Sequence, residues 1–127
     1  ICRKVIDAKV RGTNAIEIWG DGQQTRSFQF IDDCVYVAQA ILGSDITDPV
    51  NLGSSELTTI NGLVDIVEGI AGVTLERRYN LSAPKGVNGR NSDNTMIQSL
   101  LGWEPSIKLR TGLEQTYRWI FDQYAKQ

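Results

Sequence analysis

The chain has no histidine, only two cysteines and no apolar run near the length of a membrane span. Without histidine, neither a histidine-based catalytic triad nor a histidine-ligated metal site can form. Two cysteines cannot build a four-thiolate zinc site or a disulfide framework, so Cys2 and Cys34 are expected to be buried thiols in a cytoplasmic protein. A transmembrane helix needs about 20 consecutive apolar residues, so no contact with a membrane is expected.

Sequence motifs that bind nucleotides are also missing. The dinucleotide fingerprint G-x-G-x-x-G and the phosphate loop G-x-x-x-x-G-K-[ST] do not occur, and no tyrosine is followed by a lysine four residues later. The sequence therefore assigns no catalytic residue, no cofactor-binding residue and no metal ligand to this chain.

The size and charge of the chain fit an ordinary globular protein. Its 127 residues are predicted to form a single domain over 1–127, since domains most often have roughly 100–150 residues. The net charge is −2 with both signs mixed along the chain, which argues against a nucleic-acid partner. The helical apolar pattern is already running at Ile1, so a truncated chain is expected.

Apolar periodicity predicts helices that alternate with short strands. The first helix is expected to end near Gly12. The second is expected to start at Asp32 or Asp33, one of which would cap it, and the third is expected to be capped by Thr58 or Thr59. The second helix is expected to bury a stripe made of Cys34, Val35, Ala38, Ile41 and Leu42. Two more helices are expected, over 92–101 with Ser92 or Asp93 as cap, and over 111–127, with strands over 15–19, 26–31, 49–53 and 73–79. The predicted fold class is α/β (α+β-like), with short strands, about five helices and no complete Rossmann domain.

Two glycine-rich polar segments each carry an arginine. Arg26 follows the turn "GDGQQT", and Arg90 is expected directly before a helix N-terminus at Ser92. The planar guanidinium donates paired hydrogen bonds to phosphate, and a helix N-terminus favours anions. The two arginines are candidates for one diphosphate site, but the pattern equally allows two ordinary surface arginines. Trp19 and Trp103 are expected to pack in the core or at an interface rather than to act as stacking platforms.

Three segments together resemble a known family: "WGDGQQTRSFQFIDDCV", "PVNLGSSELTTINGLVDIV" and "GVNGRNSDNTMIQSLLGWEP". They resemble the C-terminal part of the extended short-chain dehydrogenase/reductases (the NAD-dependent epimerase/dehydratase family), especially its GDP-mannose 3,5-epimerase branch. In that family the N-terminal half binds NAD, and the C-terminal part closes over a nucleotide-diphosphate sugar. The resemblance implies that Arg26 and Arg90 hold the diphosphate and that Gln24 and Lys4 are on the substrate side. Asn91 and Ser92 lie in the same matched motif.

The resemblance implies a substrate-binding part that would be inactive alone, with GDP-mannose as the expected ligand and NAD bound only by the missing half. It also implies a partner, either a second copy of this chain or a Rossmann half on another chain. Two alternatives stay open at this point. The chain could be a non-catalytic binding or oligomerisation module derived from the same fold, or a folded gene fragment without a function of its own.

Overall fold

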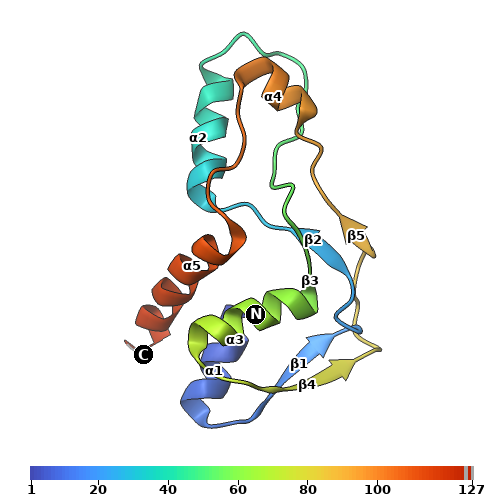
Figure 1. Ribbon diagram of the computed structural model, residues 1–127, viewed down its shortest axis with the longest axis vertical. Coiled ribbons are helices and arrows are strands. Elements are labelled where there is room, and N and C mark those ends of the chain that lie inside the picture. Colours follow the sequence, from blue (N-terminus) through green and yellow to red (C-terminus); the bar gives the residue numbers. More distant parts are fainter. Residues whose placement is uncertain (125, 127) are drawn as a thin grey trace.

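The computed structural model describes residues 1–124 and 126. These residues form five helices and five short strands (Figure 1). The helices are α1 (Cys2–Arg11), α2 (Ile31–Leu42), α3 (Ile60–Ala71), α4 (Thr95–Leu101) and α5 (Leu109–Tyr124), and the strands are β1 (Ala15–Trp19), β2 (Thr25–Ser27), β3 (Leu57–Thr59), β4 (Glu76–Asn80) and β5 (Gly89–Arg90). The predicted α/β class with about five helices is confirmed.

The strands form two small sheets. In the first, β1 pairs with β4 in parallel. In the second, β2 lies in the centre, antiparallel to β3 and parallel to β5. Figure 1 shows that the second sheet joins the lower part of the molecule, with α1, α3, β1 and β4, to the upper part, with α2 and α4.

The larger core lies between α1, β1, α3 and α5. Its most deeply buried members are Val5, Ile6, Ile18, Val64 and Val67. Each such side chain stabilises the fold by roughly 1.5–3 kcal/mol when it leaves water. Both isoleucines of β1, Ile16 and Ile18, are buried, and α3 packs into this core through its apolar side.

A second, smaller core joins α2 to α4. Val37, Ile97 and Trp103 are buried in it, and Val50 and Leu52 pack against them. The predicted strand over 49–53 is wrong, because this segment has no neighbouring strand among the described residues and therefore stays irregular. Trp103 has the packing role that the sequence predicted.

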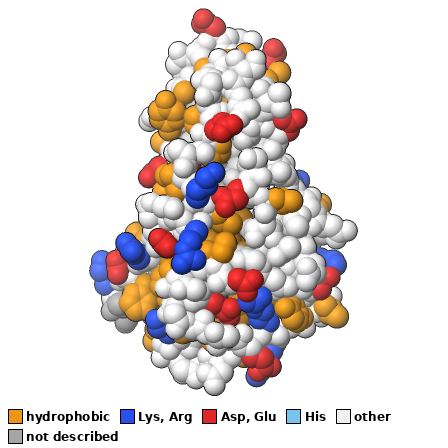
Figure 2. Space-filling view, in the orientation of Figure 1, with side chains coloured by type: hydrophobic (Ala, Val, Ile, Leu, Met, Phe, Trp, Pro, Cys, Tyr) orange, Lys and Arg blue, Asp and Glu red, His pale blue; other side chains and the backbone are white. Residues whose placement is uncertain are grey.

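Helix α2 presents a different face to the core from the predicted one. Its buried residues are Asp33 and Val37, whereas Val35 and Leu42 of the predicted stripe are exposed, and Cys34 is half-buried rather than buried. The predicted stripe has helical spacing, but the contacts of α2 with α4 select the neighbouring face. Figure 2 shows apolar atoms exposed along the edge that α2 occupies.

Helix ends follow the sequence in part. Gly12, Gly72 and Gly102 end α1, α3 and α4 in the left-handed conformation, and the side chain of Thr59 caps α3. The predicted caps of α2 are wrong. Its N-cap residue is Phe30, since Asp32 and Asp33 lie inside the first turn.

The remaining boundaries also differ from the predictions. Strand β2 ends at Ser27 rather than at residue 31, because the helix already begins at Ile31. Helix α4 begins only at Thr95 and its N-cap residue is Asn94, so neither Ser92 nor Asp93 is the N-cap that the sequence predicted. The Asp93 carboxylate still accepts hydrogen bonds from the amide and the hydroxyl of Thr95. The last helix begins at Leu109, and residues 125 and 127 of its predicted range lie outside the described residues.

Candidate functional site

Arg26 and Arg90 lie side by side in the second sheet. The parallel pairing of β2 with β5 places Arg26 directly opposite Arg90, and Thr25 opposite Gly89. Neighbouring strands are about 4.8 Å apart, and residues that are paired in register point to the same face of a sheet. The two guanidinium groups therefore start from adjacent positions on one face.

A cleft of about 520 Å³ opens beside these arginines and is called the arginine cleft here. It lies between strands β2 and β5 and the irregular segment that precedes β3. Its lining is polar, and consists of Arg26, Ser27, Gln29, Asn51, Leu52, Gly53, Ser54, Arg90, Asn91 and Ser92. Three of the residues that the sequence assigned to one motif, Arg90, Asn91 and Ser92, form one of its walls.

A second cleft, of about 320 Å³, adjoins Arg26 from the other side and is called the lysine cleft. Its lining is Ile1, Lys4, Glu17, Ile18, Trp19, Gln24, Arg26, Ile60, Pro84 and Lys85. Lys4 donates a hydrogen bond to the carbonyl of Glu17 (2.7 Å) and lies over the ring of Trp19, 5.8 Å from its centre. Trp19 is 51% exposed, so it is not part of the core, and a role in packing at an interface stays a prediction.

The Arg26 guanidinium is held by backbone carbonyl groups. Its Nη1 donates to the carbonyl of Thr25 (2.6 Å), and its Nη2 donates to the carbonyls of Val87 (2.6 Å) and Lys85 (3.4 Å). Arg26 thereby fixes the loop that separates the two clefts. Arg90 is exposed, and its side chain donates no hydrogen bond to any residue among 1–124 and 126, so all five N–H groups of the guanidinium can reach a ligand.

Each cleft contains a buried polar atom without a partner among the described residues. Gln24 is 9% exposed, and its Nε2 donates to the carbonyl of Trp19 (2.9 Å), which leaves Oε1 unsatisfied at the lysine cleft. In the arginine cleft the Nε2 of Gln29 is unsatisfied. Buried polar groups are normally hydrogen-bonded. Both atoms are closed off from solvent, so a ligand in the open clefts would contact them only after a movement of these side chains.

The site does not have the helix N-terminus that the sequence placed beside Arg90. Arg90 lies on β5, and α4 starts five residues later. The backbone amides of α3 are also occupied, because those of Ile60 and Asn61 donate to the carbonyls of Gln24 and Gly22, and that of Gly62 donates to Thr59 Oγ1. Binding of an anion here would depend on side chains.

The described residues do not fit a dinucleotide cofactor such as NAD. The glycine turn at 20–22 leads into strand β2 and not into a helix. The helix nearest to the turn, α3, uses its first amides on the turn's own carbonyl groups. A dinucleotide-binding turn instead leaves such amides free for the pyrophosphate.

Acidic side chains near the clefts are engaged with partners in the protein. The carboxylate of Asp21 accepts from the amide of Gln23, which lowers the pKa of Asp21, and Lys85 lies 3.8 Å from it. Hydrogen bonds from the hydroxyl and the amide of Thr95 lower the pKa of Asp93. These carboxylates stay ionised. The charged residues that line the two clefts are Lys4, Glu17, Arg26, Lys85 and Arg90, so positive charge is in excess there.

All six residues that the sequence proposed for ligand binding line one of the two clefts, and Arg26 lines both. The sequence reasoning missed Gln29, Lys85 and the segment 51–54. The segment was missed because it was expected to be a buried strand. Lys85 could have been suggested by its place in the long loop before Arg90, since long loops are often functional.

No protein-family model matches the chain. GDP-mannose 3,5-epimerase 1 of Oryza sativa subsp. indica is 44% identical over 130 aligned residues, which cover 99% of this chain and 32% of that protein. GDP-mannose 3,5-epimerase of Arabidopsis thaliana is 42% identical over 126 residues, with the same shares. The chain thus spans about a third of the length of these relatives.

Solved structures also match nearly the whole of this chain but only part of the other protein. The UDP-glucuronic acid 4-epimerase of Bacillus cereus, in complex with UDP-glucuronic acid and NAD, superposes with a TM-score of 0.85 at 28% identity. The match covers 97% of this chain and 40% of that chain.

None of the helices in residues 1–124 and 126 is long and apolar enough to cross a membrane.

Proposed function

We propose, on the premise that this chain corresponds to the C-terminal part of an extended short-chain dehydrogenase/reductase, that it binds a nucleotide-diphosphate sugar. The chain matches only part of the NAD-dependent nucleotide-sugar epimerases and dehydratases. In this proposal Arg26 and Arg90 bind the diphosphate between the two clefts.

The observation that carries the proposal is the register of β2 with β5, which puts Arg26 opposite Arg90. Two guanidinium groups that start from paired strand positions can donate charge-assisted hydrogen bonds to the oxygens of both phosphates. A ligand that is bound at its middle by these arginines would extend into both clefts. Gln24 and Lys4 would then face one end of it, and Asn91, Ser92 and Gln29 the other.

GDP-mannose is the ligand that we propose, because the two relatives compared above, at 44% and 42% identity, are named GDP-mannose 3,5-epimerases. The bound UDP-glucuronic acid of the Bacillus cereus enzyme makes uridine diphosphate sugars the comparison ligands.

We place this binding function in the cytoplasm, since Cys2 and Cys34 are both free thiols.

Titration calorimetry of the whole chain tests the proposed function. GDP-mannose and GDP are expected to bind, and mannose is not, because the diphosphate makes the contacts with the arginines. The affinity should fall as salt rises, since salt screens charge pairs near the surface. No heat with millimolar GDP-mannose, UDP-glucuronic acid or GDP, from a chain whose circular dichroism is that of a folded protein, would contradict the proposal.

The same samples test catalysis. The residues described do not fit a dinucleotide, so incubation with GDP-mannose and NAD is expected to give no epimer. Formation of an epimer by the chain alone would overturn this part of the proposal. A chain that is folded and binds none of these ligands would instead favour a module for association, or a chain without its own function.

We also propose that the chain forms a homodimer through the outer face of α2. Ile31 is 60% exposed, Val35 47% and Leu42 86%, and Ala38 is exposed between them at helical spacing. Exposed apolar patches of this kind tend to mediate association. Light scattering after gel filtration is expected to give the mass of a dimer for the natural chain and that of a monomer for Val35→Lys.

A matched control is Val10→Lys on α1, where the valine is 55% exposed and lies outside this face. This variant is expected to stay dimeric. A monomeric natural chain at high concentration would exclude the dimer, and loss of the dimer in the Val10 variant would place the contact elsewhere.

A further inference from the structure

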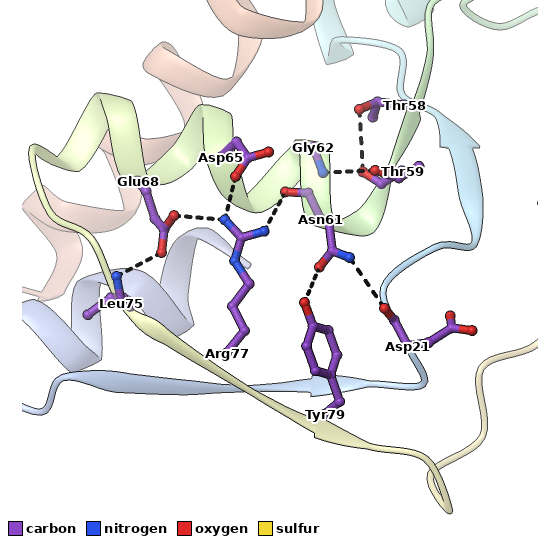
Figure 3. Close-up of polar contacts among 10 residues, drawn as sticks. All are labelled: Asp21, Thr58, Thr59, Asn61, Gly62, Asp65, Glu68, Leu75, Arg77 and Tyr79. Carbon is purple, nitrogen blue, oxygen red and sulfur yellow. Dashed lines mark hydrogen bonds and ion pairs between the residues drawn. The ribbon is translucent and has the colours of Figure 1, made fainter.

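Asn61, the second residue of α3, binds the glycine turn at residues 20–22 by two groups. Its backbone amide donates to the carbonyl of Gly22 (3.0 Å), and its side-chain Nδ2 donates to the carbonyl of Asp21 (3.3 Å). Figure 3 shows the carboxamide of Asn61 between the turn and strand β4. One residue thus fixes two consecutive peptide groups of the turn.

The carboxamide of Asn61 is held in a single orientation from the β4 side. The hydroxyl of Tyr79 donates to Oδ1 of Asn61 (3.0 Å), so that Nδ2 faces the turn. Nη1 of Arg77 donates to the backbone carbonyl of Asn61 (3.4 Å), and the same guanidinium is paired with Asp65 and Glu68 (Figure 3). The position of Asn61 is therefore set before any ligand arrives.

The glycine turn leaves room for Asn61, and the chain that follows the turn leads to Gln24 and Arg26 at the clefts. Gly22 has a left-handed φ of +72°, and a side chain on it would collide with the carboxamide of Asn61. Two residues later, the backbone carbonyl of Gln24 accepts from the amide of Ile60 (3.1 Å). Gln24 then presents its side chain to the lysine cleft, and Arg26 begins the wall shared by both clefts.

We propose that Asn61 is a positioning residue, which fixes the glycine turn and thereby places Gln24 and Arg26 for ligand binding. The proposal rests on the proposed function of the two clefts. Asn61 lines neither of them and does not touch the ligand in this arrangement. Its contribution is the preorganisation of groups that do, which reduces the entropy lost on binding.

Asn61→Ala tests the proposal, with Thr59→Ala as the control variant and Tyr79→Phe as a variant of intermediate effect. GDP is the probe, and its affinity for Asn61→Ala should fall about tenfold, the size of one lost hydrogen bond to a charged group. Thr59→Ala removes the cap of α3 at Gly62 and lowers stability, but leaves the turn contacts in place, so the affinity for GDP should not change. Tyr79→Phe removes the hydrogen bond that orients the carboxamide of Asn61, so it should weaken the binding of GDP, but by less than Asn61→Ala does.

A second measurement does not need the ligand. In the nuclear magnetic resonance spectrum of the ligand-free chain, Asn61→Ala should shift the amide signals of Gly22 and Gln24 and the Nε–H signal of Arg26, whereas Thr59→Ala should leave the Arg26 signal in place. Unchanged Gln24 and Arg26 signals, or equal affinities for GDP in the Asn61 and Thr59 variants, overturn the proposal. If the natural chain binds no GDP, the proposed function fails, and these spectra still decide whether Asn61 positions the two residues.

Discussion

Replacing Arg90 by alanine is expected to weaken the binding of GDP-mannose by about 10- to 100-fold, because hydrogen bonds to a charged group contribute roughly 1.5–3 kcal/mol and 1.4 kcal/mol is a tenfold change. Arg90 is exposed on β5 and donates to no residue in the described part of the chain, so its full donor set is available to the diphosphate. Titration calorimetry with the natural chain and the variant measures the difference in affinity.

Two further variants make this test specific. Arg110→Ala removes an equal charge on α5, where Arg110 pairs with Glu114 at the surface and lines neither cleft, and it should leave the affinity unchanged. Arg90→Lys keeps the charge but loses the planar fork, so its affinity should fall between those of the natural chain and Arg90→Ala. An affinity in Arg90→Ala equal to that of Arg110→Ala would remove Arg90 from the site.

Arg26 is expected to matter for a second reason. Its guanidinium also donates to the carbonyls of Lys85 and Val87, so it fixes the loop between the clefts as well as binding phosphate. Arg26→Ala should therefore weaken ligand binding and also increase hydrogen exchange in residues 85–88 of the ligand-free chain. This pairing of effects distinguishes Arg26 from Arg90, whose replacement should change the affinity alone.

Replacing Asp33 by asparagine is expected to lower the free energy of unfolding by about 2–3 kcal/mol, the size expected when buried donors lose their acceptor. The Asp33 carboxylate is buried, and its oxygens accept from the amide of Ser106 (3.2 Å), the hydroxyl of Ser106 (2.9 Å) and the amide of Ile107 (2.9 Å). An amide group at this position would turn an NH₂ toward these donors. Urea unfolding of both chains at pH 7 measures the difference.

The contribution of Asp33 should also depend on pH. Burial acts to raise the pKa of Asp33, but the hydrogen bonds from Ile107 and Ser106 outweigh it and hold the pKa below its ordinary value. A lowered pKa in the folded state means that the stabilisation is fully present above the ordinary value of about 3.9, and is lost as pH falls through the lower, folded-state pKa. The natural chain and Asp33→Asn should therefore become more similar in stability in strong acid.

The neighbouring aspartate supplies the control. Asp32 lies in the same first turn of α2 but is exposed, so Asp32→Asn should change stability by less than about 0.5 kcal/mol. An equal loss in both variants would mean that charge near the start of α2, and not the contact with the segment 106–107, carries the effect.

The sequence alone determined those features that depend on local chemistry. Left-handed glycines end three helices where the sequence placed Gly12, Gly72 and Gly102, because other residues adopt that conformation at a cost. The alternation of Ile16 and Ile18 in β1 and the helical spacing of the apolar residues in α3 each identified a buried face. In both segments the apolar residues recur on one side of the element only. The α/β class followed from the order of these elements.

The tertiary structure alone decided what depends on contacts distant in sequence. The sequence predicted that Asp33 caps the helix after the strand 26–31. In the structure it lies inside the first turn of α2, and its carboxylate oxygens accept from residues 106 and 107, more than 70 positions away. The stripe of α2 has helical spacing, yet α4 packs against Val37 and leaves Val35 exposed. Spacing shows that a helix has an apolar side but not which neighbour will cover it. Likewise, the pattern offered two arginines 64 positions apart, and only the pairing of β2 with β5 makes them adjacent.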